Sequence, residues 1–168
     1  PDFRPAQRRV IQSVLAGRDT LAVLPTGGGK SVCFQVPALV LDGLTVVVSP
    51  LLSLMQDQVE AAKRRGLAAA ALNSAQDADE QRTVLAALTQ GSLKLLYVSP
   101  ERLERLAGEL AAWRVKVGLL AVDEAHCISE WGHDFRPSYR LLLAARIRLG
   151  RPSVVALTGS ATPEVRTD

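Results

Sequence analysis

Short apolar runs alternate with longer amphipathic stretches along this sequence, and this alternation restricts its fold more than any other feature. Continuous Val- and Leu-rich runs are typical of parallel strands that are covered by helices on both faces. The expected strands are 20–24, 44–49, 68–72, 93–98, 117–122 and 153–157. The expected helices are 3–16, 30–41, 51–65, 78–90, 100–112 and 138–149. The pattern predicts one α/β domain with a mostly parallel sheet and right-handed crossovers.

Composition narrows the class of protein further. The chain has 168 residues, 48% of them apolar and only 4% aromatic, so we expect one core built from Leu, Val and Ala. Cys33 and Cys127 are isolated, which argues against a disulfide framework or zinc site and favours a reduced, cytoplasmic setting. No apolar stretch approaches the about 18 to 20 residues of a membrane span, so no membrane contact is expected. The net charge of +3 permits a polyanionic partner without indicating one.

Small, polar and charged residues follow every expected strand. The segments after the strands read PTGGGKS, SPLLS, LNS, SPERL, DEAH and TGSAT. In open parallel sheets, ligands bind outside the carboxyl ends of the strands. These segments are therefore the candidate functional residues.

The first of these segments has the composition of a phosphate-binding loop. Consecutive glycines, Gly27 to Gly29, allow backbone N–H groups to curl around an anion, and the following helix adds the positive end of its dipole. In this interpretation Lys30 reaches the β- and γ-phosphates and the Ser31 hydroxyl holds Mg²⁺. Leu24 stands where the usual motif has its first glycine, and an ordinary glycine-rich turn is the alternative.

The DEAH segment supplies the carboxylates that such a site needs. Asp123 is expected at a strand end, where it would hold the metal with its water shell, and Glu124 would activate the attacking water. Taken alone, DEAH would be a charged cap on a surface helix. His126 could be a core-edge residue, a metal ligand or a coupler between two sites; the adjacent Cys127 is badly directed for a shared metal, and we favour the coupler.

Directly after DEAH, an unusual loop gathers aromatic side chains in a chain that is poor in them. CISEWGHDFRPSY, residues 127–139, contains Trp131, Phe135 and Tyr139 beside His133 and Arg136. Aromatic rings stack on nucleic-acid bases at about 1 to 3 kcal/mol each, and arginine adds phosphate or cation–π contacts. Together with DEAH, this loop closely resembles the aromatic-rich loop of RecQ-family DNA helicases.

Six segments in order resemble the first motor domain of that family over the whole chain. They are FRPAQ (3–7), PTGGGKS (25–31), VVVSPLLSLMQDQV (46–59), LLYVSPERL (95–103), AVDEAH (121–126) and ALTGSAT (156–162). The resemblance implies that residues 1–168 form a RecA-like, three-layer α/β/α domain of the P-loop NTPase class. Gly159, Ser160 and Glu130 depart from the usual family pattern.

The resemblance also implies a role for each matching residue, with ATP and Mg²⁺ as cofactors and single-stranded and forked DNA as partners. Catalysis is assigned to Lys30, Asp123, Glu124 and His126, and the metal to Ser31 and Asp123. Nucleotide contacts are assigned to Arg4, Gln7, Pro25, Thr26, Gly27, Gly28, Gly29, Lys30 and Ser31. DNA binding and coupling are assigned to Ser49, Ser53, Ser99, Arg102, Trp131, His133, Phe135, Arg136, Thr158 and Thr162. By spacing alone, SP and SPER are ordinary helix caps with proline in the first turn, and both interpretations can hold together.

The family hydrolyses ATP between two RecA-like domains, the second of which supplies arginine fingers. We therefore expect a fragment of a 3′–5′ helicase that binds nucleotide weakly and turns it over barely. Three alternatives stay open: a DEAH-type RNA helicase, a module that binds ATP without using it, and a small-molecule P-loop kinase. The small-molecule kinase is the weakest alternative, because it gives the aromatic loop no function.

Overall fold

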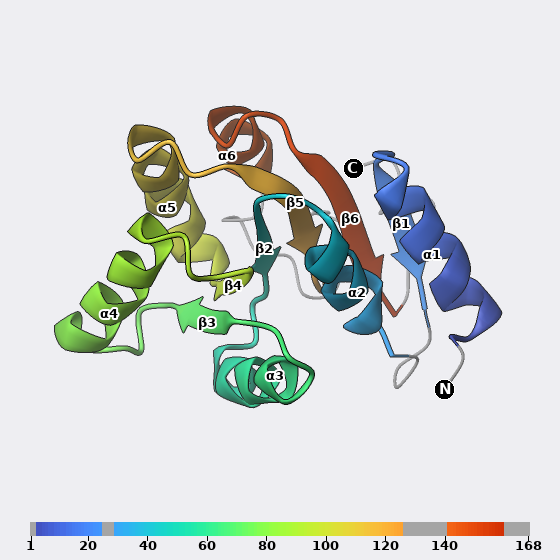
Figure 1. Cartoon of the computed structure of the whole chain (residues 1–168), viewed down its shortest axis with the longest axis horizontal. Helices are drawn as coiled ribbons and strands as arrows, with labels where there is room; N and C mark the ends of the chain where they lie inside the picture. The colour runs from blue at the N-terminus through green and yellow to red at the C-terminus, as the bar shows by residue number, and fades with distance from the viewer. Residues whose placement is uncertain (1–2, 25–28, 126–140, 160–168) are drawn as a thin grey trace.

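The computed structural model describes residues 3–24, 29–125 and 141–159, and these ranges form a single sheet with helices on both faces (Figure 1). The strands are β1 (Thr20–Val23), β2 (Leu44–Val48), β3 (Ala69–Leu72), β4 (Leu95–Val98), β5 (Val117–Val122) and β6 (Ser153–Thr158). The helices are α1 (Pro5–Leu15), α2 (Val32–Val40), α3 (Leu52–Arg64), α4 (Ala78–Thr89), α5 (Pro100–Ala112) and α6 (Leu142–Arg148).

All strand pairs of the sheet are parallel, in the order β1-β6-β5-β2-β4-β3. The last strand, β6, thus lies between the first strand and β5. Val47 of β2 is aligned with Tyr97 of β4 on one side and Ala121 of β5 on the other. The α/β class and the parallel sheet predicted from the sequence are confirmed.

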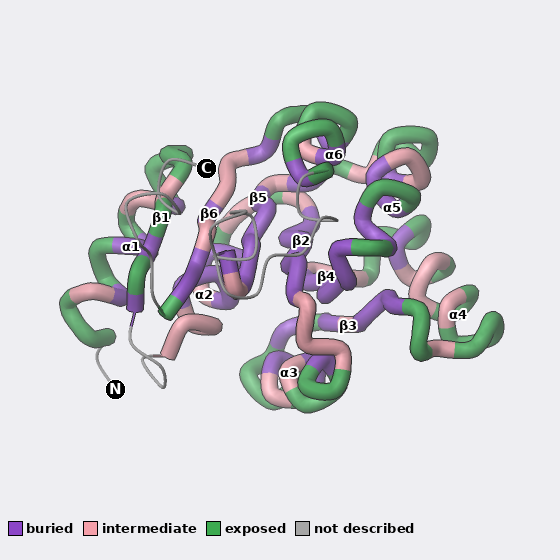
Figure 2. The backbone as a smooth tube through the Cα atoms, turned by 180° about the vertical axis from the view of Figure 1, so that it is seen from behind, coloured by how far each residue is buried: buried purple, intermediate pink, exposed green. Residues whose placement is uncertain are grey.

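The two faces of the sheet carry separate apolar clusters. Helices α1, α2 and α3 pack on one face, where their side chains join those of Val47, Tyr97 and Ala121. Helices α4, α5 and α6 cover the other face, where Val46 and Val48 point. Every residue of β2 is buried, and Figure 2 shows this burial continuing into the neighbouring strands. Leu, Val and Ala dominate both clusters, as predicted, but the sheet divides the expected single core into two.

Local sequence signals account for several helix starts. At α1 the Gln7 side chain accepts a hydrogen bond from the Arg4 backbone N–H at 2.9 Å, and Pro5 occupies the first turn. At α4 the Asp77 carboxylate accepts the backbone N–H of Glu80 at 2.8 Å. The helix expected over 138–149 corresponds to α6, which begins at Leu142. Residues 138–140, the first part of that expected helix, lie outside the described residues.

None of the helices in the described ranges is long and apolar enough to cross a membrane.

Candidate nucleotide and metal site

Gly29, Lys30 and Ser31, which follow β1 in the chain, and the DEAH carboxylates after β5 lie at one edge of the sheet. Gly29 has φ +71°, the left-handed region that glycine adopts without strain, and Lys30 and Ser31 lead directly into α2. Pro25, Thr26, Gly27 and Gly28 lie outside the described residues.

Lys30 contacts both DEAH carboxylates. Its Nζ lies 3.0 Å from Glu124 Oε1, to which it donates a hydrogen bond, and 3.6 Å from Asp123 Oδ1. All three side chains are largely shielded, with 21%, 23% and 11% of the Lys30, Glu124 and Asp123 side chains exposed. Residues far apart in the sequence therefore form one charged cluster, as the site prediction requires.

Burial and charge act in opposite directions on this cluster. Burial alone would lower the pKa of the Lys30 ammonium, but the charges and hydrogen bonds of Asp123 and Glu124 outweigh it and raise that pKa. Burial raises the pKa of the Asp123 carboxyl, with Lys30 opposing the shift and the charge of Glu124 adding to it. Lys30 therefore stays a cation, available to a phosphate.

The backbone after β5 turns sharply to present the two adjacent carboxylates. The Asp123 N–H donates to the carbonyl of Val48 at 2.9 Å, which extends the pairing of β5 with β2 by one residue. Glu124 has φ +55°, an uncommon value for a residue with a side chain, and its N–H donates to Asp123 Oδ1 at 3.0 Å. This left-handed step is what allows consecutive side chains to meet the same lysine.

The oxygen donors at this edge fit Mg²⁺. Ser31 precedes α2 and offers a hydroxyl, and Asp123 offers a carboxylate; such hard oxygens are the ligands that Mg²⁺ prefers, with phosphates and waters completing the shell. Within the described ranges no three His, Cys, Asp or Glu side chains cluster as a protein-only metal cage. The arrangement thus suits a metal that is shared with a bound phosphate.

Gln7 has a contact that the sequence did not predict. Its Nε2 donates to the carbonyl of Gly29 at 3.2 Å, so the side chain ties α1 to the phosphate loop while it also caps its own helix. A Cβ at Gly29 would overlap the Gln7 amide. Gln7 is buried and contacts Gly29, whereas Arg4, which bonds to the Gln7 side chain, is exposed.

The predicted DNA contacts lie at the same edge but differ in exposure. Ser53, in the first turn of α3, is exposed, whereas Ser49 is buried and its hydroxyl accepts the Leu51 N–H at 3.3 Å. Ser99 is buried, and Arg102 is 8% exposed with Nη1 at 2.7 Å from Glu109 of the same helix. The DNA role of Arg102 stays a prediction, and its ion pair gives it a structural role inside α5.

The carbonyl of Thr158, the last residue of β6, accepts a hydrogen bond from the N–H of Leu24 at 2.9 Å. This bond continues the pairing of β6 with β1 by one residue, to the point where the chain enters the predicted phosphate loop. The remaining predicted residues lie outside the described ranges: His126, Trp131, His133, Phe135, Arg136 and Thr162.

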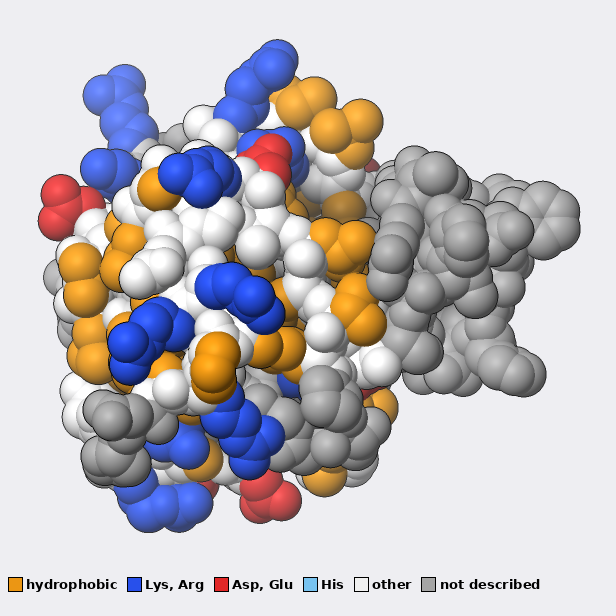
Figure 3. Space-filling model, turned by 90° about the vertical axis from the view of Figure 1, so that its right-hand side faces the viewer, with side chains coloured by type: hydrophobic (Ala, Val, Ile, Leu, Met, Phe, Trp, Pro, Cys, Tyr) orange, Lys and Arg blue, Asp and Glu red, His pale blue; other side chains and the backbone are white. Residues whose placement is uncertain are grey.

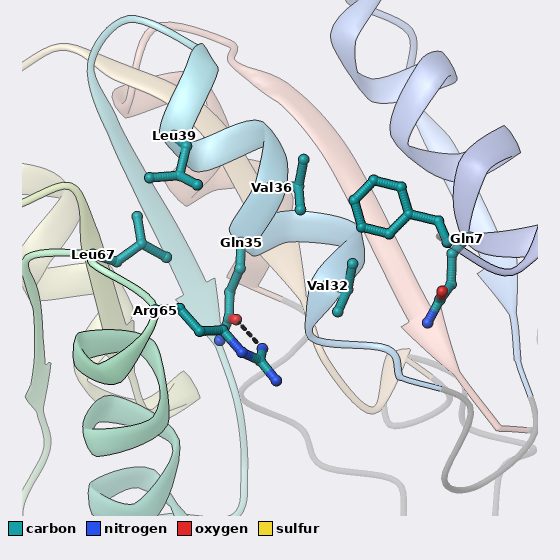
Figure 4. Close-up of a pocket in the computed structure, with 8 residues that line it drawn as sticks. Gln7, Val32, Gln35, Val36, Leu39, Arg65 and Leu67 are labelled. Carbon is teal, nitrogen blue, oxygen red and sulfur yellow. Dashed lines mark hydrogen bonds between the residues drawn. The ribbon is translucent and has the colours of Figure 1, made fainter. Parts of the chain in front are cut away.

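A further group of polar residues was missed by sequence reasoning. Gln35 of α2 is 4% exposed and bonds to Tyr97 and Arg65, beside a pocket of about 350 Å³ that reaches Phe3 and Gln7 (Figure 4). The available signal was a single amide inside the otherwise apolar stretch VCFQVPALV.

The surface at the α1 side is basic but not uniformly so. Figure 3 looks onto this side and shows more Lys and Arg than Asp and Glu, interspersed with apolar side chains. Arg8 and Arg9 in α1, and Arg18 just after it, are exposed. Such a mixture permits a polyanion nearby and does not by itself mark a nucleic-acid groove.

Comparison with known sequences identifies the family. The family described as DEAD/DEAH box helicase matches residues 4–168. This chain belongs to that family. It is 50% identical over 167 residues to the probable ATP-dependent DNA helicase RecS of Bacillus subtilis, covering 99% of this chain and 33% of the relative. It is 48% identical over 168 residues to the ATP-dependent DNA helicase RecQ of the same organism, covering 99% and 28%. The RecQ resemblance drawn from the motifs is confirmed, and the chain spans about a third or less of these relatives.

Solved structures agree on the fold. The Mycobacterium smegmatis helicase Lhr bound to ssDNA and AMP-PNP gives a TM-score of 0.76 at 21% identity, covering 98% of this chain and 24% of that one. A hypothetical ATP-dependent RNA helicase from Sulfolobus tokodaii gives 0.77 at 19% identity, covering 99% and 49%. At these identities the likeness shows the fold alone, and it confirms the RecA-like fold.

Proposed function

We propose that this domain is the first motor domain of a 3′–5′ RecQ-type DNA helicase, which binds Mg-ATP and couples its hydrolysis to unwinding in DNA repair and recombination. The observation that carries the proposal is the approach of Lys30 Nζ to both Glu124 and Asp123, at 3.0 and 3.6 Å. This is the arrangement that phosphoryl transfer needs, because a cation for the phosphates lies beside carboxylates for metal and water.

Each of these side chains has a task that its position supports. Lys30 exchanges its carboxylate partners for the β- and γ-phosphates when a nucleotide binds, since all are anions competing for one ammonium. Ser31 and Asp123 would hold Mg²⁺, which neutralises charge that develops on the phosphates. Glu124, released from Lys30, accepts a proton from the attacking water.

The other parts of the motor are assigned by resemblance to the RecQ family. A second RecA-like domain would close over the nucleotide with its arginine fingers, each worth about 10³ to 10⁵ in rate. The aromatic loop and His126 would report bound single-stranded or forked DNA to the nucleotide site. We place the protein in the cytoplasm, associated with the nucleoid, and expect this chain alone to be nearly inactive in turnover.

The first test measures binding of a fluorescent ADP analogue with Mg²⁺ to this chain. Lys30→Ala should weaken binding at least about tenfold, because it removes the charge-assisted contacts of the ammonium. Lys63→Ala is the matched control: its ammonium is exposed, lies 3.9 Å from Glu60 on α3, and should leave binding unchanged.

Turnover is then measured with and without single-stranded DNA or RNA. Negligible turnover by a chain that binds nucleotide supports a motor domain that needs its second half. Equal binding by the unaltered chain and Lys30→Ala would contradict the proposal, and stimulation by RNA alone would favour the DEAH-type RNA helicase.

A further inference from the structure

A buried amide stands inside the helix that follows the phosphate loop. Gln35 is 4% exposed although its neighbours in α2 are mostly apolar. Burying an amide is unfavourable unless its donors and acceptors are satisfied. A leucine would fill the same position without that requirement, so the partners of the amide call for an explanation.

The amide connects three elements of the fold. Its Nε2 donates to the Tyr97 hydroxyl of β4 at 3.3 Å, and its Oε1 accepts a hydrogen bond from Arg65 Nη1, just after α3. Figure 4 shows the Gln35 and Arg65 side chains meeting in the space between α2 and α3. Tyr97 is 1% exposed, and its ring contacts Phe34 edge to face with centroids 6.1 Å apart. Tyr97 is thus fixed on the sheet, while Arg65 is exposed at the rim of the pocket.

Both ends of this connection are close to the proposed site. The Gln35 backbone N–H donates to the Ser31 carbonyl at 2.9 Å, so residue 35 follows Ser31 by one helical turn, and Lys30 directly precedes Ser31. On the sheet, Tyr97 is aligned with Val47 and through it with Ala121, which precedes Asp123 by two residues on the same face. The Gln35–Tyr97 hydrogen bond therefore links α2 to the sheet at the register position of Ala121 in β5, the strand that leads to Asp123.

We infer that Gln35 is a positioning residue for the nucleotide site: its bonds to Tyr97 and Arg65 hold α2 so that Lys30 and Ser31 face the DEAH carboxylates at the correct distance. The inference rests on the proposed function, because it concerns the affinity of that same site for Mg-nucleotide. Arg65 directly follows α3, whose first turn contains Ser53. A displacement of α3 would therefore be transmitted to α2 through the Arg65–Gln35 hydrogen bond.

The test compares Mg²⁺-dependent binding of the fluorescent ADP analogue by Gln35→Leu, Tyr97→Phe and the double variant of this chain. Gln35→Leu should weaken affinity about fivefold, and Tyr97→Phe, which removes a single oxygen, about two- to threefold. The double variant should be no weaker than Gln35→Leu alone, because both changes act through one contact.

Leu88→Ala is the stability control, since Leu88 of α4 is 2% exposed and packs in the apolar cluster on the face of the sheet opposite to α2. It should lower the melting temperature like the other variants and leave nucleotide affinity unchanged. That contrast separates positioning from a general loss of stability.

Unchanged affinity in the folded Gln35→Leu and Tyr97→Phe variants would overturn the inference and leave the proposed function standing. If Gln35→Leu fails to fold, Tyr97→Phe decides by itself. Failure of the unaltered chain to bind, or equal binding by Lys30→Ala, would overturn the proposed function and the inference with it.

Discussion

The chemistry of single residues near the phosphate loop is set by how far each is withdrawn from water. Lys30, Asp123 and Glu124 are largely shielded but keep 21%, 11% and 23% of their side chains exposed, so solutes can still reach them. Cys33, two positions after Ser31, is fully buried, and burial raises the pKa of its thiol to about 11. Within one turn of chain, Lys30 is a cation that forms ion pairs and Cys33 is a protonated, buried thiol.

Cys33 should resist alkylation in the folded protein. With Cys127→Ser removing the other thiol, iodoacetamide at pH 8 should modify Cys33 at least about 100-fold more slowly in the native chain than in urea, because a pKa two units higher leaves a hundredth of the thiolate. Mass spectrometry of timed samples measures both rates. Equal rates would mean that the thiol is accessible.

The same shift predicts a dependence of stability on pH. The folded pKa of about 11 exceeds the ordinary 9.0, so the unfolded chain loses this proton first as the pH rises. The contribution of the thiol to folding is therefore fully present below pH 9 and is lost as the pH rises towards 11. Urea titrations of Cys33→Ala, compared with the unaltered chain across this window, measure the contribution.

Among the elements, α5 ends in a geometry that suits glycine but carries arginine. The N–H of Val115 donates to Leu110 at 3.0 Å and that of Arg114 to Ala111 at 3.2 Å, the paired bonds of a Schellman motif. Arg114 has φ +54° in this motif and is exposed. A side chain in this conformation costs about 1 to 2 kcal/mol relative to glycine.

Arg114→Gly should therefore stabilise the domain by up to about 1 kcal/mol, which corresponds to about 2 to 4 °C in melting temperature for a chain of this size. Arg105→Gly is the control, because Arg105 is exposed within the same helix and glycine there should cost about 1 kcal/mol. Differential scanning calorimetry measures both. A shift of the same sign in the two variants would contradict the assignment of strain to Arg114.

For the whole molecule, the turn between α2 and β2 is held against β5 by a close backbone approach. The register between β2 and β5 shifts between Leu44 and Thr45, which leaves Gly118 as the extra residue of a bulge. A Cβ at Gly118 would overlap the carbonyl oxygen of Asp42. This contact lies at the amino ends of β2 and β5, and the opposite end of β5 leads to Asp123 and Glu124.

Gly118→Ala should destabilise the domain by about 1 to 3 kcal/mol, because the obstructing atom belongs to the backbone and cannot rotate away. Gly108→Ala is the control: its new Cβ would meet only the end of the flexible Arg148 side chain, and alanine is favoured in a helix. Denaturant unfolding compares the two free energies. Equal stability in both variants would show that the backbone of the turn adjusts freely.

The sequence predicted the elements well, because apolar runs such as 117–122 match buried strands. It also singled out Lys30, Asp123 and Glu124 before their contact was known. It could not predict the connection through Gln35, since its partners come from β4 and from the end of α3 and share no spacing with it. The burial of Arg102 was missed for the same reason: exposure depends on which helix packs beside it.

The place of β6 in the sheet has a consequence for how the protein is made on the ribosome. In the described part of the chain β1 pairs only with β6, and β6 in turn pairs with β5. A nascent chain that has not yet released residues 153–158 thus lacks the strand that joins Lys30 to Asp123. The cluster of Lys30, Asp123 and Glu124 is therefore completed only after β6 emerges, and a shorter translation product lacks the assembled cluster.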